Sequence, residues 1–317
     1  MPESNNIPED MVSAIEEFSR EAEEIVGAFT RRVAAQPPPS RIYHYTSDEG
    51  LRGILQSGRL WLTDIFSLND PSELRHGFSP VINALSAKAA SGPAEAKSFA
   101  DRFERFAIRG GVEASAHYFV CSFSASGDDL GQWRAYADNA RGFALGFDAD
   151  VLERSFAGGS SNTSTFPLAY SGTELQEIHR GLVDRMFSLI SLPRGRNLGS
   201  GTLTEYLKSL SVALTLPALH AALFFKHEAY SNEKEYRFLR IDSVGAPSGN
   251  VKYRSRPHSL IPYCEFDWRV VAESALTEIL VGPADQDKAL RFVRDCLRAF
   301  HRGSVTLTRS TIPYRAP

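Results

Sequence analysis

Residues 41–62 decide the fold of this chain, and they read RIYHYTSDEGLRGILQSGRLWL. Residues 41–45 predict a short strand. Apolar side chains at helical spacing follow over residues 48–57, after a Thr-Ser cap, and Gly58 ends that helix. Residues 60–62 then begin a second strand. The stretch therefore predicts a strand, a helix and a strand in immediate succession.

Periodic segments extend outward from this unit in both directions. On the N-terminal side, residues 8–35 predict an amphipathic helix, which the proline-rich residues 36–40 end. On the C-terminal side, alternating or apolar runs predict strands at residues 117–124, 142–147, 236–241, 275–281 and 305–309. Helical spacing predicts helices at residues 81–108 (with a break), 128–136, 173–191, 203–227 and 285–301. Residues 155–165, rich in Gly, Ser and Thr, are expected to form a mobile loop.

The order of these segments predicts a mixed α+β fold with a largely antiparallel sheet. Strands occur in separated clusters, which a doubly wound parallel sheet does not produce. Residues 1–40 are interpreted as an N-terminal helix with a proline-rich linker. Residues 41–317 are interpreted as a single α+β domain with a helical insertion at about residues 171–227.

Composition sets broad limits on function. Hydrophobic residues make up 43% of the chain and its formal net charge is -3, so general affinity for nucleic-acid backbone is not a dominant property, although a local basic patch remains open. Three widely spaced cysteines argue against a disulfide framework or a cysteine-only metal site. We expect a cytoplasmic protein without membrane association, because no secretory signal and no run of about 20 apolar residues is present.

Common catalytic motifs are missing from the sequence. There is no Gly-x-Ser-x-Gly, no phosphate-binding loop ending in Gly-Lys-Ser/Thr and no Gly-x-Gly-x-x-Gly. His227-Glu228 lacks the second histidine of a His-Glu-x-x-His zinc site, so no metal is expected.

Polar residues gather at four places. His44 lies where a strand meets a helix, between Tyr43 and Tyr45 and followed by Thr46, and strand ends of this kind frame ligands. On the strand, His44 points away from the face that Tyr43 and Tyr45 share. Residues 66–73 are read first as a turn and helix start, with a ligand-facing role left open for Asn69 or Glu73.

The third and fourth places combine aromatic and charged residues. Trp133 and Tyr136 share a helix face, which is typical of core packing, yet with Arg134 and Arg141 nearby they could stack on a planar ring and hold a phosphate. Glu233, Glu235 and Arg237 stand two apart, so an extended segment presents them on one face. Such a row is either a solvated strand face or a pair of carboxylates in a cleft.

The order of motifs resembles the DUF2971 family of bacterial proteins from about residue 41 to residue 315. The resemblance rests on residues 43–46, 54–62, 69–73, 121–124, 133–138, 142–148, Lys226, 233–237, 279–283 and 310–315. The family name implies no function.

A second, weaker resemblance is to the ADP-ribosyltransferase fold. Enzymes with that fold carry a His on the first strand, a later aromatic residue and a Glu on a late strand, and His44, Tyr136 and Glu235 match these positions. The resemblance implies that NAD is the substrate, that His44 holds its adenosine ribose and that Glu235 stabilises the ribose cation. It also implies that an aromatic ring stacks on nicotinamide, with Tyr118 and Tyr170 as alternatives to Tyr136. Glu233 would orient an acceptor, and Arg134 or Arg141 would pair with the pyrophosphate. The long helical insertion departs from that pattern.

The leading hypothesis is therefore an NAD-dependent transferase or NAD glycohydrolase, by analogy an effector in bacterial conflict or phage defence, acting on a protein or nucleic-acid acceptor. A non-catalytic nucleotide sensor and a protein-interaction module are the alternatives. The enzyme hypothesis and the nucleotide-sensor hypothesis both require His44, Tyr136 and Glu235 to converge on one cleft.

Overall fold

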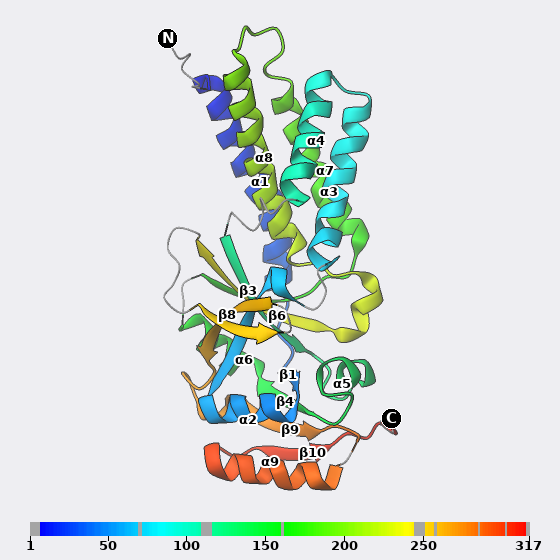
Figure 1. The fold of residues 1–317 in the computed structure, drawn as a ribbon, viewed down its shortest axis with the longest axis vertical. Coiled ribbons are helices and arrows are strands. Elements are labelled where there is room, and N and C mark those ends of the chain that lie inside the picture. Colours follow the sequence, from blue (N-terminus) through cyan, green and yellow to red (C-terminus); the bar gives the residue numbers. More distant parts are fainter. Residues whose placement is uncertain are drawn as a thin grey trace. The chain divides into compact units, whose positions relative to one another are not determined.

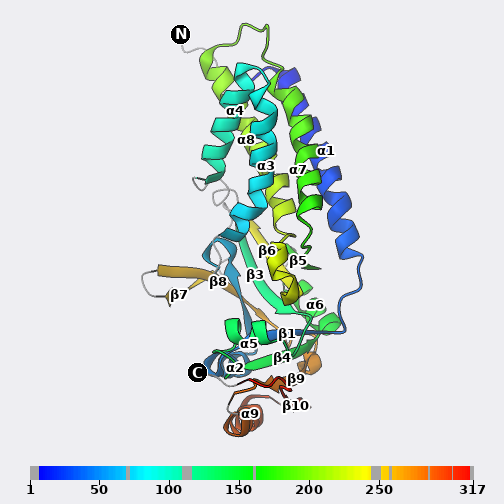
Figure 2. The same cartoon turned by 90° about the vertical axis from the view of Figure 1, so that its right-hand side faces the viewer.

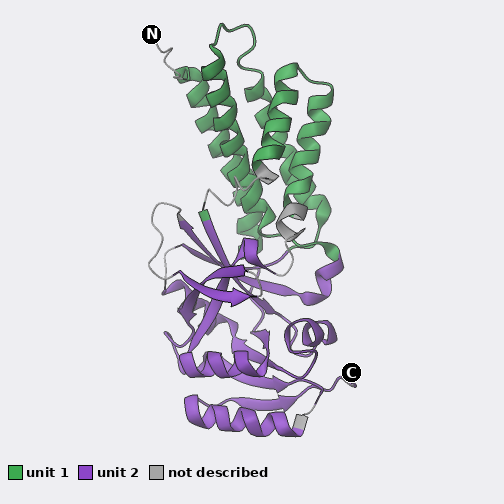
Figure 3. Ribbon diagram, in the orientation of Figure 1, with its two compact units in different colours: residues 1–35, 69–116, 169–228 green, residues 36–68, 117–168, 229–317 purple. Residues whose placement is uncertain are grey.

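The computed structural model of the protein describes residues 7–68, 72–108, 116–159, 162–243, 251–256, 259–284, 286–301 and 303–314 (Figure 1). The chain divides into two compact units, which Figure 3 draws in different colours. Unit 1 comprises residues 1–35, 69–116 and 169–228, and unit 2 comprises residues 36–68, 117–168 and 229–317. Each unit therefore joins segments that lie far apart in the sequence.

Unit 1 is built from long helices that lie alongside one another (Figures 1 and 2). They are α1 (Glu9–Ala34), α3 (Ser72–Ala90), α4 (Ala94–Ile108), α7 (Gly172–Ile190) and α8 (Ser200–Ala222). α1 packs against α7 and α8, and α3 packs against α4, α7 and α8. No helix among the described residues is long and apolar enough to cross a membrane.

The N-terminal helix is an integral part of unit 1. It buries an apolar stripe consisting of Met11, Phe18, Ala22, Val26, Phe29 and Val33. Phe29 stacks on Phe225 with ring centroids 4.8 Å apart. The helix predicted over residues 8–35 is thus confirmed, and its buried face shows that it supplies part of the core of unit 1.

The interior of unit 1 contains one histidine with an unusual environment. His179 of α7 is fully buried. Its Nε2 lies 3.3 Å from the carbonyl oxygen of Ala218, whereas its Nδ1 is buried without a partner among the described residues. Burial lowers the pKa of His179 to about 4, because a protonated ring would place a charge in an apolar interior.

We predict that His179 makes unit 1 less stable in acid. The unfolded chain binds a proton below about pH 6.5 and the folded chain only below about pH 4, so the free energy of unfolding falls as the pH drops through that interval, by up to about 3 kcal/mol. Chemical unfolding of wild type and His179→Leu at a series of pH values measures this. An unchanged pH dependence in His179→Leu would contradict the prediction.

Unit 2 contains an open, largely antiparallel sheet of ten strands, which confirms the predicted mixed α+β class. Its strands are β1 (Arg41–Thr46), β2 (Arg59–Asp64), β3 (Ala116–Ser124), β4 (Phe143–Asp148), β5 (Thr163–Pro167), β6 (Glu235–Ser243), β7 (Lys252–Arg256), β8 (Ser259–Asp267), β9 (Leu276–Val281) and β10 (Thr306–Arg309). The order is β10-β9-β4-β1-β3-β2-β8-β7, and β6 pairs with both β3 and β5. β10 is parallel to β9.

One face of this sheet, which we call the helix face, carries the main core. α2 (Asp48–Ser57), α6 (Ala149–Ala157) and α9 (Gln286–Phe300) contribute to it. Ile42 from β1, Phe123 from β3 and Phe238 from β6 are among the strand residues in this core. As predicted, α2 begins at a cap, where Ser47 Oγ accepts from the Gly50 N–H at 3.2 Å, and ends at Gly58 with φ +66°.

The opposite face, which we call the α5 face, carries a smaller apolar cluster. α5 (Leu130–Tyr136) lies on it and packs against β1. The cluster consists of Tyr45, Trp133, Ala137, Ala140, Ala144 and Leu280, with Tyr43, Ile312 and Tyr314 at its margin. The two faces therefore hold distinct sets of side chains.

In the turn after α5, the backbone passes close to the backbone of β1. Asp138, Asn139 and Ala140 have φ of 46°, 50° and 71°, which is rare for residues with a side chain. The turn leads into Gly142, where an added Cβ would lie 2.2 Å from the carbonyl oxygen of Thr46. Only glycine leaves room for β1 at this point.

Substituting Gly142 by Ala is predicted to destabilise the protein by about 2 kcal/mol or more, since backbone atoms must move to admit the methyl group. Gly53→Ala in α2 is the matched control, because no atom lies within 4 Å of its added Cβ. There we expect a gain of about 0.5–1 kcal/mol from helix propensity. Denaturant unfolding measures both; equal stabilities would refute the steric explanation.

Three sequence expectations differ from the structure. Residues 155–165 are not a loop throughout: Ser155 and Phe156 are buried in α6, and β5 begins at residue 163. The strands β7 and β8 had no counterpart among the predicted elements. The helix expected over 203–227 ends at residue 222.

The boundaries of the two units also differ from the predicted division at residue 40. The helices α3 and α4, within the range assigned to the α+β domain, belong with α1, α7 and α8 to unit 1. The turn predicted at residues 69–71 lies outside the described residues, as do the side chains of residues 72–76, Glu73 among them.

Candidate functional site

Polar side chains collect on the α5 face where β1, β3 and β6 meet. Because side chains alternate along a strand, Ser122 and Ser124 of β3 point to one face and Phe123 to the other. Tyr45 of β1 contacts Trp133 on the α5 face, with ring centroids 4.8 Å apart. All of these residues belong to unit 2.

Glu235 is the centre of this polar cluster. Its Oε1 accepts from Ser122 Oγ at 2.7 Å and from Arg237 Nε at 2.9 Å, and Arg237 Nη2 lies 2.8 Å away. Glu235 is buried and Arg237 is only 1% exposed, whereas Ser122 is exposed. The carboxylate is therefore held in a buried ion pair and reaches the surface through a serine hydroxyl.

Glu233 does not continue the row of Glu235. It ends the 3₁₀ helix η2 (Glu228–Glu233), and Lys234 then has φ +46° before β6 begins. The sequence predicted that Glu233 and Glu235 lie on one face of an extended segment. This prediction is wrong, because Glu233 belongs to a 3₁₀ helix and only Glu235 belongs to a strand. Ser124 Oγ donates to the carbonyl oxygen of Glu233 at 2.7 Å, which fastens this turn to β3.

Tyr136 lies at the exposed border of the cluster. Its hydroxyl donates to Glu233 Oε1 at 3.3 Å, and 42% of the residue is exposed. Glu233 precedes Glu235 by two residues in the chain, so the structure brings Tyr136, Glu233 and Glu235 into one neighbourhood.

Trp133, a residue of α5, points into the interior, and no part of it is exposed. Its indole Nε1 donates to Asp128 Oδ1 at 2.8 Å. The ring contributes to the apolar cluster of the α5 face and has no free surface for stacking on a ligand. Arg134 and Arg141, in contrast, are exposed, on α5 and just before β4.

Asp128 joins α5 to the C-terminal segment. Besides Trp133, its carboxylate accepts from Ser310 Oγ at 2.6 Å and from the Thr311 N–H at 2.9 Å. Partial burial raises the pKa of Asp128, but these hydrogen bonds together outweigh it and leave the pKa below its usual value. The carboxylate is thus stabilised in its charged form as a structural acceptor.

His44 lies apart from this cluster. It occupies the position on β1 that alternates with Tyr45, and its ring packs 5.6 Å from Phe123, which belongs to the core of the helix face. Burial lowers the pKa of His44, and its contact with the Ser122 carbonyl oxygen offsets this only in part. Thr46, on the same side of β1, is buried beside Gly50 of α2. The required convergence of His44 with Tyr136 and Glu235 is not observed.

Neither Ser122 nor Asp128 was predicted from the sequence to be a site residue. A signal for Ser122 exists, since Ser122, Ser124 and Ser126 recur every second residue at the end of a predicted strand. Asp128 gives no such signal, because its partners Ser310 and Thr311 are distant in the chain.

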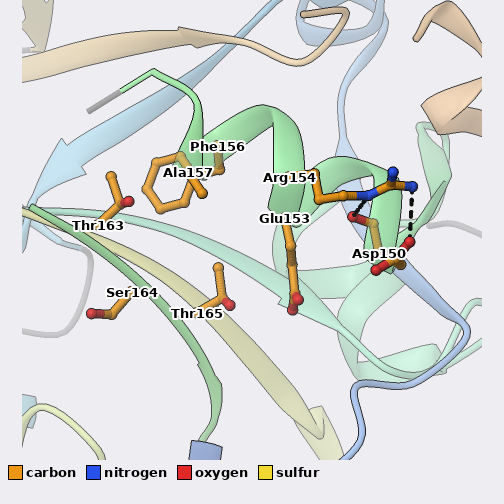
Figure 4. Close-up of a pocket in the computed structure, with 8 residues that line it drawn as sticks. All are labelled: Asp150, Glu153, Arg154, Phe156, Ala157, Thr163, Ser164 and Thr165. Atoms are coloured by element: carbon orange, nitrogen blue, oxygen red, sulfur yellow. Dashed lines mark hydrogen bonds and ion pairs between the residues drawn. The ribbon is translucent and has the colours of Figure 1, made fainter. Parts of the chain in front are cut away.

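A pocket of about 260 Å³ lies elsewhere in unit 2, between α6 and β5 (Figure 4). Its lining consists of Asp150, Glu153, Arg154, Phe156, Ala157, Thr163, Ser164 and Thr165. Glu153 accepts from the Tyr236 hydroxyl at 2.5 Å. Burial and this carboxylate raise the pKa of Tyr236. None of the residues predicted from the sequence lines it.

The described residues contain no group of three or more His, Cys, Asp or Glu side chains placed to hold a metal ion. Cys121, Cys264 and Cys296 are buried free thiols. Burial raises the pKa of Cys264 to about 12 and raises that of Cys121 further, so neither provides a thiolate nucleophile near neutral pH.

Comparison with known proteins confirms one resemblance. The model of the family described as "Protein of unknown function (DUF2971)" matches residues 132–238, which extend from α5 to β6 and include Tyr136, Glu233 and Glu235. Neither a curated protein nor a solved structure matches this chain.

The buried pair of Glu235 and Arg237 yields a stability prediction. Arg237→Met leaves the carboxylate buried without its cation and should cost about 3–5 kcal/mol. In Glu235→Leu/Arg237→Met neither charge remains, so most of the loss should be recovered. Urea unfolding of both variants measures this. A double variant no more stable than Arg237→Met would show that the pair is not the cause.

Proposed function

We propose that this protein is an NAD-dependent ADP-ribosyltransferase-like protein or an NAD glycohydrolase in which Glu235 is the catalytic carboxylate. The observation that carries the proposal is the hydrogen bond of 2.7 Å between the exposed Ser122 hydroxyl and the buried Glu235 carboxylate. It connects a negative charge, held in a low-dielectric environment, to the surface. A carboxylate so placed stabilises a developing positive charge more strongly than one in water.

The proposed reaction begins with cleavage of the bond between the nicotinamide nitrogen and the ribose. The electron pair of that bond leaves with nicotinamide, and positive charge develops on the ribose, as in glycoside hydrolysis. Glu235 stabilises this cation. An acceptor hydroxyl or water then forms the new bond to the ribose and loses its proton to Glu233.

The surrounding residues take binding roles in this proposal. The exposed ring of Tyr136 stacks on nicotinamide, and Arg134 or Arg141 pairs with the pyrophosphate. The position of His44 on the other face of β1 argues against its proposed contact with the adenosine ribose. Tyr45 and Trp133 support α5 rather than contact the substrate.

A non-catalytic nucleotide sensor is the second candidate. The observation in its favour is that Arg237, itself almost fully buried, already compensates the charge of Glu235. An ion pair of this kind reduces the field that the carboxylate exerts on a substrate. A sensor would bind NAD or a related nucleotide and gain thermal stability without consuming it.

Nicotinamide release from NAD tests the two candidates. We predict release by wild type and a loss of at least about 100-fold in Glu235→Gln, assayed below the melting temperature of the variant because Arg237 then lacks its counter-ion. Glu228→Gln, at an exposed glutamate, is the matched control and should retain activity. If wild type releases no nicotinamide with protein, DNA and RNA acceptors present, the enzymatic proposal fails.

A further inference from the structure

The edge of the sheet in unit 2 carries a row of basic side chains. β7 is the last strand in the order and lies on the outer side of β8 (Figure 2). Lys252, Arg254 and Arg256 alternate along it and point to one face. Their cross-strand partners are Tyr263, Ile261 and Ser259, so these β8 residues share that face.

An exposed tryptophan adjoins this row. Tyr263 pairs with Thr63 of β2, and Trp61 lies two residues from Thr63 on the same face. Trp61 is 44% exposed, although Tyr263 packs 4.5 Å from its ring and the Arg254 guanidinium lies 5.6 Å from it. The ring is therefore held in place while much of its surface stays accessible. We call Trp61, Tyr263, Lys252, Arg254 and Arg256 the basic-aromatic surface.

Positive charge on this surface exceeds negative charge. Glu265 pairs with both Lys252, at 2.9 Å, and Arg59, at 3.5 Å. Arg254 and Arg256 have no carboxylate partner in the part of the chain that the structure describes. Burial, together with the like charge of Arg256, lowers the pKa of Arg254. Two uncompensated guanidinium groups side by side form a site for an anion.

The need to keep an edge strand from pairing with other chains explains some of these basic residues but not all of them. Charged residues on an edge strand prevent pairing with other chains, which accounts for Lys252 and Arg256. It does not account for an exposed tryptophan two strands inward. It also does not account for Arg254, which is half-buried, reaches Thr63 Oγ1 at 3.1 Å and has its Nε buried without a partner among the described residues.

We propose that the basic-aromatic surface binds single-stranded nucleic acid. Arg254 and Arg256 contact consecutive phosphates, and Trp61 stacks on a base. Basic grooves that follow the backbone, with aromatic rings on which bases stack, are the usual means of binding single strands without sequence preference. An acidic peptide offers charge to the arginines but no planar base to Trp61. The proposal does not depend on NAD chemistry.

The full-length protein with a fluorescein-labelled dT12 oligonucleotide provides the test, read by anisotropy across a salt series. Trp133 and Trp268 are fully buried, so quenching of tryptophan fluorescence on binding reports on Trp61. Trp61→Ala should weaken binding at least about fivefold, whereas Trp61→Phe keeps most of the affinity but loses the quenching. Arg254→Ala/Arg256→Ala should reduce the salt slope by about 1.4.

A control variant and a substitute test variant keep the outcome decisive. Arg294→Ala/Arg298→Ala removes the same charge from the exposed side of α9 and should leave affinity and slope unchanged. Arg256→Ala alone gives half the slope change if the double variant does not fold. The proposal is overturned if dT12 does not bind at 50 mM salt, if the surface variants bind like wild type, or if a labelled 12-residue polyglutamate binds equally well without quenching.

Discussion

β3 sends Phe119, Cys121 and Phe123 to one face of the sheet and Ser122 and Ser124 to the other. The apolar set is enclosed by α2, α6 and α9, so β3 cannot shift by one residue without placing two serines in that core. Because β3 pairs with β1, β2 and β6, its register also decides which side chains of those strands meet. The cluster around Glu235 is a consequence of that register.

The burial of Glu235 has two opposing effects. A carboxylate out of water is costly, and Arg237 offsets that cost through two nitrogen atoms on one oxygen. The same pairing reduces the charge that a ligand would experience. A catalytic role therefore requires the pair to weaken when substrate binds, whereas a sensor or a structural role does not. The left-handed Lys234 brings Glu233 near Tyr136 and away from this pair, so the two glutamates have different environments.

Local features of this fold were predictable from the sequence and long-range ones were not. The cap at Ser47, the stop at Gly58 and the face of α1 depend on residues within a turn or two, and all three are observed. Alternation also predicted that His44 and Tyr45 diverge. Alternation could not predict that the His44 ring packs against Phe123, or that Asp128 accepts a hydrogen bond from Ser310. Such pairs depend on the order of the strands and on contacts between distant segments. The strand β7 escaped notice because Lys252–Arg256 is charged and mostly exposed rather than apolar.

The two proposed surfaces share the α5 face and are continuous through β2. Thr63, which accepts from Arg254, pairs with Val120 of β3, and Ser122 lies two residues further along. An anion bound near Ser122 can therefore also attract Arg254, so loss of affinity for NAD in an Arg254 variant would not identify the bound species. Arg256 and Trp61 separate the cases, since one extends further out along β7 and the other offers a ring that a pyrophosphate does not use. A nucleic acid strand engages both residues, and a nucleotide held at Ser122 engages neither.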